Sequence, residues 1–201
     1  MKYILLTLVI LGVTVFLVLE KRNKKPARHF APPSEGLVAQ VMCSGTDKLS
    51  PKKYKYDGIG DCRSAALLFG GPKDCEKGCV GLASCASVCD RNAIHIIGGI
   101  AAVDRAKCDG CGECVNICPK GVIKLIPKNA VYWVGCSYCG QEPNTDGLCE
   151  VGCNGCGECV NACPQGAITI QNGRAHINYE LCAACGACKN VCPRKSIWQV
   201  I

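Results

Sequence analysis

Aromatic residues and histidines are scarce in this chain. Of its 201 residues only 5% are aromatic, with two Trp and three Phe, and only three are His. So few large apolar side chains argue against a large conventional hydrophobic core, and domains with weak cores need other crosslinks. No pairing of a nucleophile with a base is evident, so we do not expect the chain to transform a substrate by itself.

Several cofactor motifs are also missing. The sequence contains no C-x-x-C-H, no G-x-G-x-x-G and no G-K-[ST], which disfavours covalent haem, a dinucleotide fold and a P-loop. The formal net charge is +7, but no basic stripe with aromatic platforms accompanies it. Nucleic acid is therefore not predicted as a partner.

Cysteine, in contrast, is abundant, with 21 residues. Two C-x2-C-x2-C-x3-C-P runs extend from Cys153 to Pro193, with eighteen residues between Cys163 and Cys182. This spacing is typical of a two-cluster bacterial ferredoxin, in which the fourth Cys of each run binds the cluster of the other run. One predicted [4Fe-4S] cluster is held by Cys153, Cys156, Cys159 and Cys192, and a second by Cys182, Cys185, Cys188 and Cys163.

Zinc and disulfides are the competing interpretations of these runs. Zinc sites favour two CxxC pairs with a longer gap between them. Disulfides do not come as three-Cys loops followed by a fourth Cys and a Pro, and an odd number of Cys argues against full pairing. We therefore expect iron–sulfur clusters, which would also stabilise the weak core.

A related pair of runs precedes this one. A complete run contains Cys108, Cys111, Cys114 and Cys118, and a degenerate run contains Cys75, Cys79, Cys85 and Cys89. Counting back from Cys89, the position equivalent to Cys156 is occupied by Leu82. We predict that Cys75 replaces the lost ligand, with Cys62 as the alternative. The two clusters would then be held by Cys75, Cys79, Cys85 and Cys118, and by Cys108, Cys111, Cys114 and Cys89.

Residues 75–126 and 149–201 are thus two copies of one module, and the duplication extends upstream. The segment Val131–Ser137 resembles Val38–Ser44, and Cys149 precedes Cys153 as Cys75 precedes Cys79. Hairpin-like patterns with Gly98-Gly99 and Asn172-Gly173 turns lie in the corresponding gaps. The predicted fold class is α+β, with two tandem two-cluster bacterial ferredoxin-like modules after one N-terminal transmembrane helix.

Five cysteines remain after four clusters are counted. They are small buried residues or the ligands of a fifth iron–sulfur site, with Cys136-x2-Cys139 and Cys149 as its natural core. The remaining cysteines are Cys43, Cys62, Cys136, Cys139 and Cys149. About 16 Fe per chain would indicate four [4Fe-4S] clusters, and about 20 Fe a fifth.

The N-terminal segment carries the membrane prediction. Tyr3 to Leu19 contains no charged residue, and a basic run from Lys21 to Lys25 follows it. Such a segment predicts a short transmembrane helix, and the basic flank predicts a cytoplasmic soluble part. A cleaved signal peptide is the alternative, but no small-x-small cleavage site follows. The predicted domains are residues 1–20 (anchor), 21–36 (basic Pro-rich linker), 37–130 (first module with an insert) and 131–201 (second module).

Two further segments carry a family resemblance. Tyr56–Ala66 and Gly70–Cys75, together with the apolar N-terminus and the ferredoxin runs, resemble the B subunit of the Rnf electron-transport complex over roughly residues 38 to 201. The resemblance implies a protein at the inner (plasma) membrane whose iron–sulfur clusters take electrons from reduced ferredoxin and relay them to membrane partner subunits of an ion-translocating oxidoreductase. Family members usually carry another cluster domain before the region of Cys43, where this chain has only the linker. The alternative is a membrane-tethered polyferredoxin that serves a hydrogenase or dehydrogenase.

Overall fold

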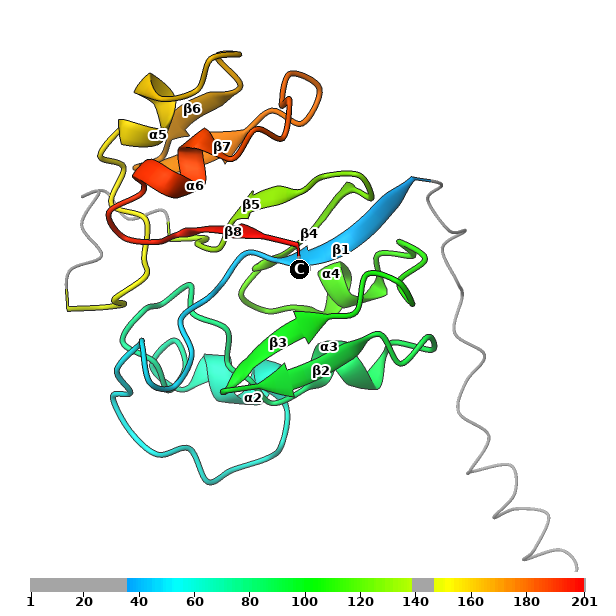
Figure 1. The fold of residues 1–201 in the computed structure, drawn as a ribbon. Coiled ribbons are helices and arrows are strands. Elements are labelled where there is room, and N and C mark those ends of the chain that lie inside the picture. Colours follow the sequence, from blue (N-terminus) through cyan, green and yellow to red (C-terminus); the bar gives the residue numbers. More distant parts are fainter. Residues whose placement is uncertain (1–35, 139–146, 201) are drawn as a thin grey trace, which may run out of the picture. The chain divides into compact units, whose positions relative to one another are not determined.

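The computed structural model describes residues 36–138 and 147–200. Its elements are short, and they follow the chain in two similar series (Figure 1). The first series is β1 (Leu37–Val41), α2 (Cys62–Leu67), α3 (Ser84–Ser87), β2 (Ile94–Ile97), β3 (Ile100–Val103), α4 (Glu113–Ile117) and β4 (Ile123–Pro127). The second series is β5 (Tyr132–Val134), α5 (Glu158–Asn161), β6 (Ile168–Gln171), β7 (Arg174–Ile177), α6 (Ala187–Val191) and β8 (Ile197–Gln199).

Each series forms two antiparallel two-stranded sheets. In the first, β1 pairs with β4 and β2 with β3; in the second, β5 pairs with β8 and β6 with β7. The first and last strands of each series are therefore paired, and the other two strands form a hairpin that lies between them in sequence. We refer to the two series as the first and second halves. The hairpins predicted around the Gly98-Gly99 and Asn172-Gly173 turns are both present. Two ferredoxin-like α+β units are thus present.

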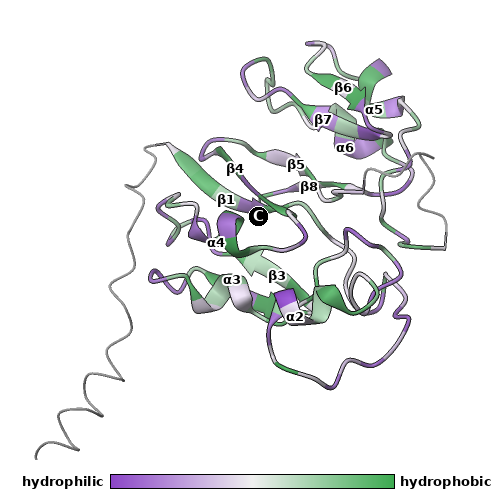
Figure 2. Ribbon diagram, turned by 180° about the vertical axis from the view of Figure 1, so that it is seen from behind, coloured by the Kyte–Doolittle hydropathy of each residue, from purple (hydrophilic) through white to green (hydrophobic). Residues whose placement is uncertain are grey.

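Thiols occupy much of the hydrophobic core. In the first half Cys79, Cys85 and Cys114 are buried together with aliphatic side chains of β1, β2 and β4. In the second half Cys136, Cys159 and Cys188 are buried in the same way. Figure 2 shows β1 as hydrophobic along most of its length. The scarcity of aromatic residues is therefore matched by a core in which cysteines take the place of large side chains.

One part of the predicted fold class was wrong. Within residues 36–138 and 147–200 no helix is long and apolar enough to cross a membrane, and this overturns the transmembrane helix in the predicted architecture. The helices α2 and α3 contain six and four residues, whereas a span needs about 20. The segment on which the prediction rested, Tyr3–Leu19, lies outside the described residues, as do linker residues 21–35. A single-pass location is equally unsupported.

Candidate iron–sulfur centres

Each cysteine run turns into a short helix at its third cysteine. The helices α4, α5 and α6 follow Gly112, Gly157 and Gly186, whose φ angles are 82°, 84° and 81°. Glycine adopts this left-handed conformation at little steric cost. The turn places the third cysteine of each run in the first helical turn, where it is buried. These cysteines are Cys114, Cys159 and Cys188.

The degenerate run keeps the same turn without the glycine. Ala83 precedes α3 with φ 62°, and Cys85 is buried in the first turn of that helix. A left-handed conformation costs a non-glycine residue about 1–2 kcal/mol. The fold therefore imposes the ferredoxin-type loop here even though the sequence has lost one cysteine and this glycine.

Two of the predicted ligand sets each line a single cavity. Cys89, Cys108, Cys111 and Cys114 line one cavity. Cys163, Cys182, Cys185 and Cys188 line another. In both sets three cysteines come from one run and the fourth from the other run of the same half. The structure therefore brings these predicted ligands together in the crossed arrangement that the spacing predicts.

A third predicted set gathers around Cys159. Burial, together with the nearby thiols of Cys153, Cys192 and Cys156, raises the pKa of this thiol to about 11. Cys159 packs in the second core with Cys153 and Cys192 close by. These four cysteines are therefore neighbours, as the spacing predicts.

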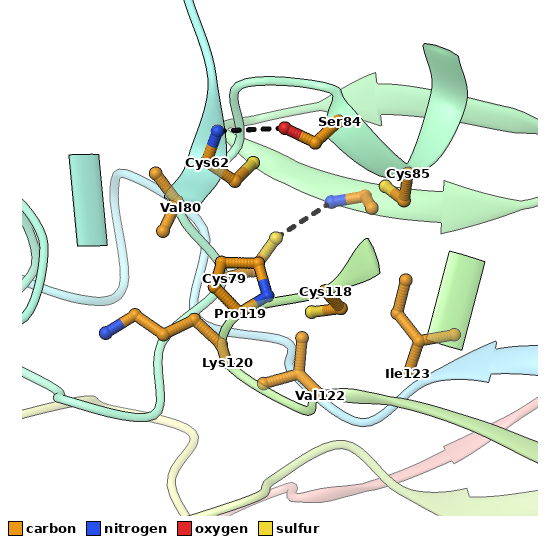
Figure 3. Close-up of a pocket in the computed structure, with 11 residues that line it drawn as sticks. Cys62, Cys79, Val80, Ser84, Cys85, Cys118, Pro119, Lys120, Val122 and Ile123 are labelled. Atoms are coloured by element: carbon orange, nitrogen blue, oxygen red, sulfur yellow. Dashed lines mark hydrogen bonds between the residues drawn. The ribbon is translucent and has the colours of Figure 1, made fainter. Parts of the chain in front are cut away.

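The degenerate run has a different fourth neighbour from the one predicted. Cys79, Cys85 and Cys118 line a cavity together with Cys62 (Figure 3). Cys75 does not line this cavity; it lies in another one, with Cys43, Cys136 and Cys149. Cys139, the remaining candidate for a fifth site, lies outside the described residues.

A polar network fixes the position of Cys62. The side chain of Asp61 caps α2 by accepting a hydrogen bond from Ser64 N (2.7 Å). The Ser84 hydroxyl donates to Asp61 Oδ1 (3.0 Å) and accepts from Cys62 N (2.8 Å). The start of α2 is thereby attached to the start of α3, which carries Cys85. No signal in the cysteine spacing favours Cys62 over Cys75, because the bond between Ser84 and Asp61 joins segments that are 23 residues apart.

Backbone amides donate to several of the sulfurs. The last cysteine of a run accepts from the amide four residues later in three runs: Ala93 N to Cys89 (3.4 Å), Ala167 N to Cys163 (3.3 Å) and Ser196 N to Cys192 (3.3 Å). The hairpins contribute equivalent donors in the two halves, from Ala101 N to Cys79 (3.5 Å) and from Ala175 N to Cys153 (3.4 Å). Hydrogen bonds to sulfur are one of the factors that set the potentials of iron–sulfur clusters.

The buried thiols must lose protons before they can bind a metal cluster. Burial raises the pKa of Cys79 to about 11 and the pKa values of Cys85 and Cys114 to about 12. Metal ligation requires the thiolate, so binding at such sites releases protons. Within the described residues, no group of three His, Cys, Asp or Glu side chains is arranged to hold a single metal ion. Sets of four thiols around apolar cavities fit the ligand chemistry of iron–sulfur clusters.

Comparisons with known proteins agree with this chemistry. Residues 152–196 match a 4Fe-4S dicluster domain family, and residues 100–123 match a 4Fe-4S binding domain family. The fold and the thiol sets define a ferredoxin-like iron–sulfur protein, and the chain binds more than one [4Fe-4S] cluster.

The chain is also similar to named components of larger complexes. It is 42% identical over 147 residues to the B subunit of the Na⁺-translocating ferredoxin:NAD⁺ oxidoreductase complex of Acetobacterium woodii, covering 72% of this chain and 44% of the relative. It is 37% identical over 154 residues to the B subunit of the proton-translocating ferredoxin:NAD⁺ oxidoreductase complex of Clostridium ljungdahlii, covering 76% and 54%. The family resemblance is therefore confirmed, although the chain spans only about half the length of these relatives.

A different redox protein shares a smaller part. An iron–sulfur subunit of the CoB–CoM heterodisulfide reductase of Methanopyrus kandleri is 32% identical over 85 residues, which are 41% of this chain and 12% of the relative. Ferredoxin-type runs are thus shared with redox proteins outside the ion-translocating complexes.

Proposed function

We propose that this chain is an iron–sulfur electron-transfer subunit of an Rnf-like ion-translocating oxidoreductase complex. The observation that carries the proposal is the gathering of cysteines into sets of four, in a chain whose relatives are named as the B subunit of such complexes. When bound, [4Fe-4S] clusters accept and donate electrons one at a time. A chain with several clusters therefore suits relay rather than transformation of a bound substrate.

Four ligand sets make up the proposed relay. Three are those predicted from spacing, and in the fourth we assign Cys62 in place of Cys75, because Cys62 lines the cavity of Cys79, Cys85 and Cys118. The complete sets are Cys62, Cys79, Cys85 and Cys118; Cys89, Cys108, Cys111 and Cys114; Cys153, Cys156, Cys159 and Cys192; and Cys163, Cys182, Cys185 and Cys188. We further propose that residues 37–130 and 131–201 are the two modules.

The protein residues around these sets hold and tune the ligands. Amides such as Ala93 N and Ala101 N donate to the sulfurs of Cys89 and Cys79, which favours the charged form of each ligand. Apolar side chains such as Ile123 keep water away from the cavity that Cys62, Cys79, Cys85 and Cys118 line. Burial combined with amide donors is the arrangement by which a protein adjusts a cluster potential.

The proposed donor is reduced ferredoxin, and the proposed partners are the other subunits of the complex. Both follow from the names of the two relatives, which belong to ferredoxin:NAD⁺ oxidoreductase complexes that translocate Na⁺ or protons. Since translocation requires a membrane, we propose that the chain works in a complex at the inner (plasma) membrane, with its iron–sulfur part on the cytoplasmic side.

A polyferredoxin that serves another redox enzyme is the second candidate. The similarity to part of a heterodisulfide reductase favours it. Purification from native membranes under mild detergent separates the two. Recovery with flavin-bearing membrane subunits supports the Rnf-like complex, and recovery with a soluble hydrogenase, dehydrogenase or reductase supports the alternative.

Electron uptake tests the relay itself. The reconstituted chain is mixed anaerobically with ferredoxin that has been reduced beforehand, and the visible absorbance of both proteins is followed by stopped flow. We expect bleaching of this chain at the rate at which ferredoxin is reoxidised. Reduced ferredoxin that stays reduced in the presence of the oxidised chain would contradict the proposed donor.

A further inference from the structure

We propose a fifth [4Fe-4S] site at the junction of the two repeats, held by Cys43, Cys75, Cys136 and Cys149. The proposal rests on the iron–sulfur role proposed above, but it adds a ligand set that neither family match covers. We call these four cysteines the junction set. It differs from the fifth site suggested by spacing, because it contains Cys75 and does not use the Cys136-x2-Cys139 pair.

The four cysteines of the junction set line one cavity. In the same way, four cysteines line each of two cavities of the ferredoxin-type sets. Cys136 and Cys149 are buried, with 7% and 9% of their surface exposed. Burial raises the pKa of Cys75, and the nearby thiols of Cys43 and Cys149 raise it further, so the sulfurs are close to one another.

The duplication explains why four thiols meet here. Cys43 and Cys136 occupy equivalent positions after β1 and β5, and Cys75 and Cys149 each precede the next run by four residues. The site is therefore built from two equivalent pairs, one from each repeat. A ligand set with the internal symmetry of the chain is difficult to attribute to ordinary packing of small residues.

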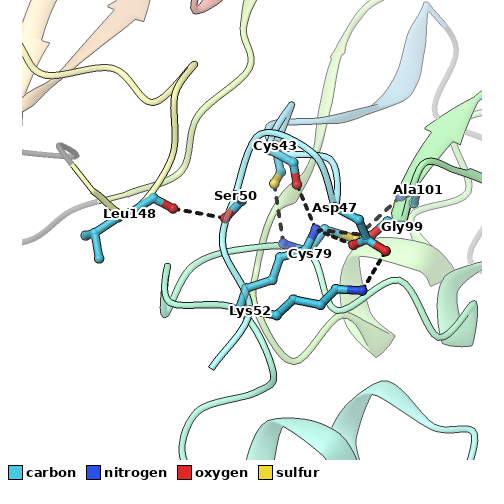
Figure 4. A network of polar contacts seen from close by, with 10 residues as sticks. Cys43, Asp47, Ser50, Lys52, Cys79, Gly99, Ala101 and Leu148 are labelled. Atoms are coloured by element: carbon cyan, nitrogen blue, oxygen red, sulfur yellow. Dashed lines mark hydrogen bonds and ion pairs between the residues drawn. The ribbon is translucent and has the colours of Figure 1, made fainter. Parts of the chain in front are cut away.

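Hydrogen bonds hold the two repeats together beside this cavity. Ser44 N donates to Gly135 O (2.9 Å), and the Ser137 hydroxyl donates to Met42 O (2.8 Å). These bonds are reciprocal, since Ser44 and Ser137 are equivalent residues of the two repeats. On the other side, the Ser50 hydroxyl donates to Leu148 O (3.0 Å), next to Cys149 (Figure 4).

The junction set also touches the neighbouring ligand sets in both halves. Cys79 N donates to Cys43 Sγ (3.3 Å; Figure 4). Cys79, a member of the ligand set that contains Cys62, is therefore attached directly to the junction set. In the second half Cys153 packs against the core cluster that contains Cys136. Cys79 and Cys153 are equivalent first ligands of their runs. A cluster at the junction would therefore lie between the cluster of Cys79 and that of Cys153, and would connect the modules.

Positive charge faces the junction from both repeats. The side chain of Lys73 is only 2% exposed; its Nζ donates to Gly45 O (2.7 Å) and lies 3.7 Å from Asp47 Oδ1. Arg194 Nη2 donates to Cys149 O (2.7 Å), so a second cation lies beside a cysteine of the junction set. Cations beside four thiols favour an anionic thiolate-ligated group over four neutral thiols.

Metal analysis of the full chain tests the junction set without any substitution. The protein is reconstituted anaerobically with iron and sulfide, desalted, and assayed for iron, sulfide and zinc. We expect about 20 Fe per chain. About 16 Fe with normal [4Fe-4S] EPR signals would overturn the junction site and leave the proposed function intact, as would zinc in place of the missing iron. Absence of all [4Fe-4S] signals would instead contradict the proposed function.

Two variants test which cysteines are the ligands. The double variant Cys43→Ala with Cys136→Ala should lower the iron content from about 20 to about 16 Fe per chain while the ferredoxin-type EPR signals persist. The matched control Cys139→Ala should keep about 20 Fe. Full iron in the double variant, or loss of about four Fe in the control, would overturn the assignment. Should the double variant not fold, the iron content of the unsubstituted chain still decides whether the site exists.

Discussion

Replacement of Gly155 by alanine tests how tightly the fold constrains a cluster-binding loop. Gly155 lies between the ligands Cys153 and Cys156, with φ +69°, and a Cβ atom there would lie 2.7 Å from Gly173 O in the β6–β7 turn. The left-handed conformation costs about 1–2 kcal/mol for alanine. Contact with a backbone carbonyl that cannot move freely adds roughly 1–3 kcal/mol. The expected destabilisation is therefore roughly 2–5 kcal/mol.

Gly166 is the matched control, because it shares the strain but not the contact. Its φ is +59° and nothing lies within 4 Å of its ideal Cβ position, so Gly166→Ala should cost only about 1–2 kcal/mol. Thermal release of the clusters, followed by visible absorbance under anaerobic conditions, reports the difference. At about 4–8 °C per kcal/mol for a small domain, Gly155→Ala should lower the midpoint clearly further. Equal midpoints for the two variants would refute the close approach of Gly155 to Gly173.

Three further substitutions test the ligand map and its surroundings. Cys62→Ala should remove about four Fe per chain together with one EPR signal; unchanged iron would contradict the assignment of Cys62. Asp61→Ala removes the N-cap of α2 and the acceptor of the Ser84 hydroxyl, so the temperature midpoint of cluster release should fall. The control Asp57→Ala changes an exposed residue and should leave this midpoint unchanged. Equal midpoints for the two variants would contradict a positioning role for Asp61. Lys73→Met removes a buried positive charge beside the junction set, so redox titration should show the reduction potential of one cluster lowered by an amount on the order of tens of millivolts. Unchanged cluster potentials would contradict the argument that this positive charge stabilises the reduced junction cluster.

Local spacing predicted most of the ferredoxin-like fold. The three complete runs and the two hairpins follow from residues that are close in sequence, because the loop around a cluster and the turn of a hairpin are local structures. The short helices at Cys114 and Cys188 follow from the glycine before each of them. Even the degenerate run could be aligned with a complete one, and in the structure Ala83 adopts the left-handed turn that glycine adopts in the complete runs.

Contacts between distant segments could not be predicted in this way. Cys75 is nearer in sequence to Cys79 than Cys62 is. However, the hydrogen bond between Ser84 and Asp61 holds Cys62 at the cavity of Cys79, Cys85 and Cys118. The convergence of Cys43, Cys75, Cys136 and Cys149 depends on how the repeats pack, which sequence spacing does not encode.

The transmembrane helix in the predicted fold class rested on apolar composition alone, and within residues 36–138 and 147–200 no helix could span a membrane.

Low-temperature EPR of the reconstituted full chain, reduced anaerobically with dithionite, tests the central claim most directly. A relay built from several thiolate-ligated clusters predicts the spectra of reduced [4Fe-4S] clusters, with interaction between neighbouring clusters that are attached through Cys43 and Cys79. The integrated spin should approach one electron per four iron atoms. A reduced sample with bound iron but no [4Fe-4S] spectrum would contradict the account.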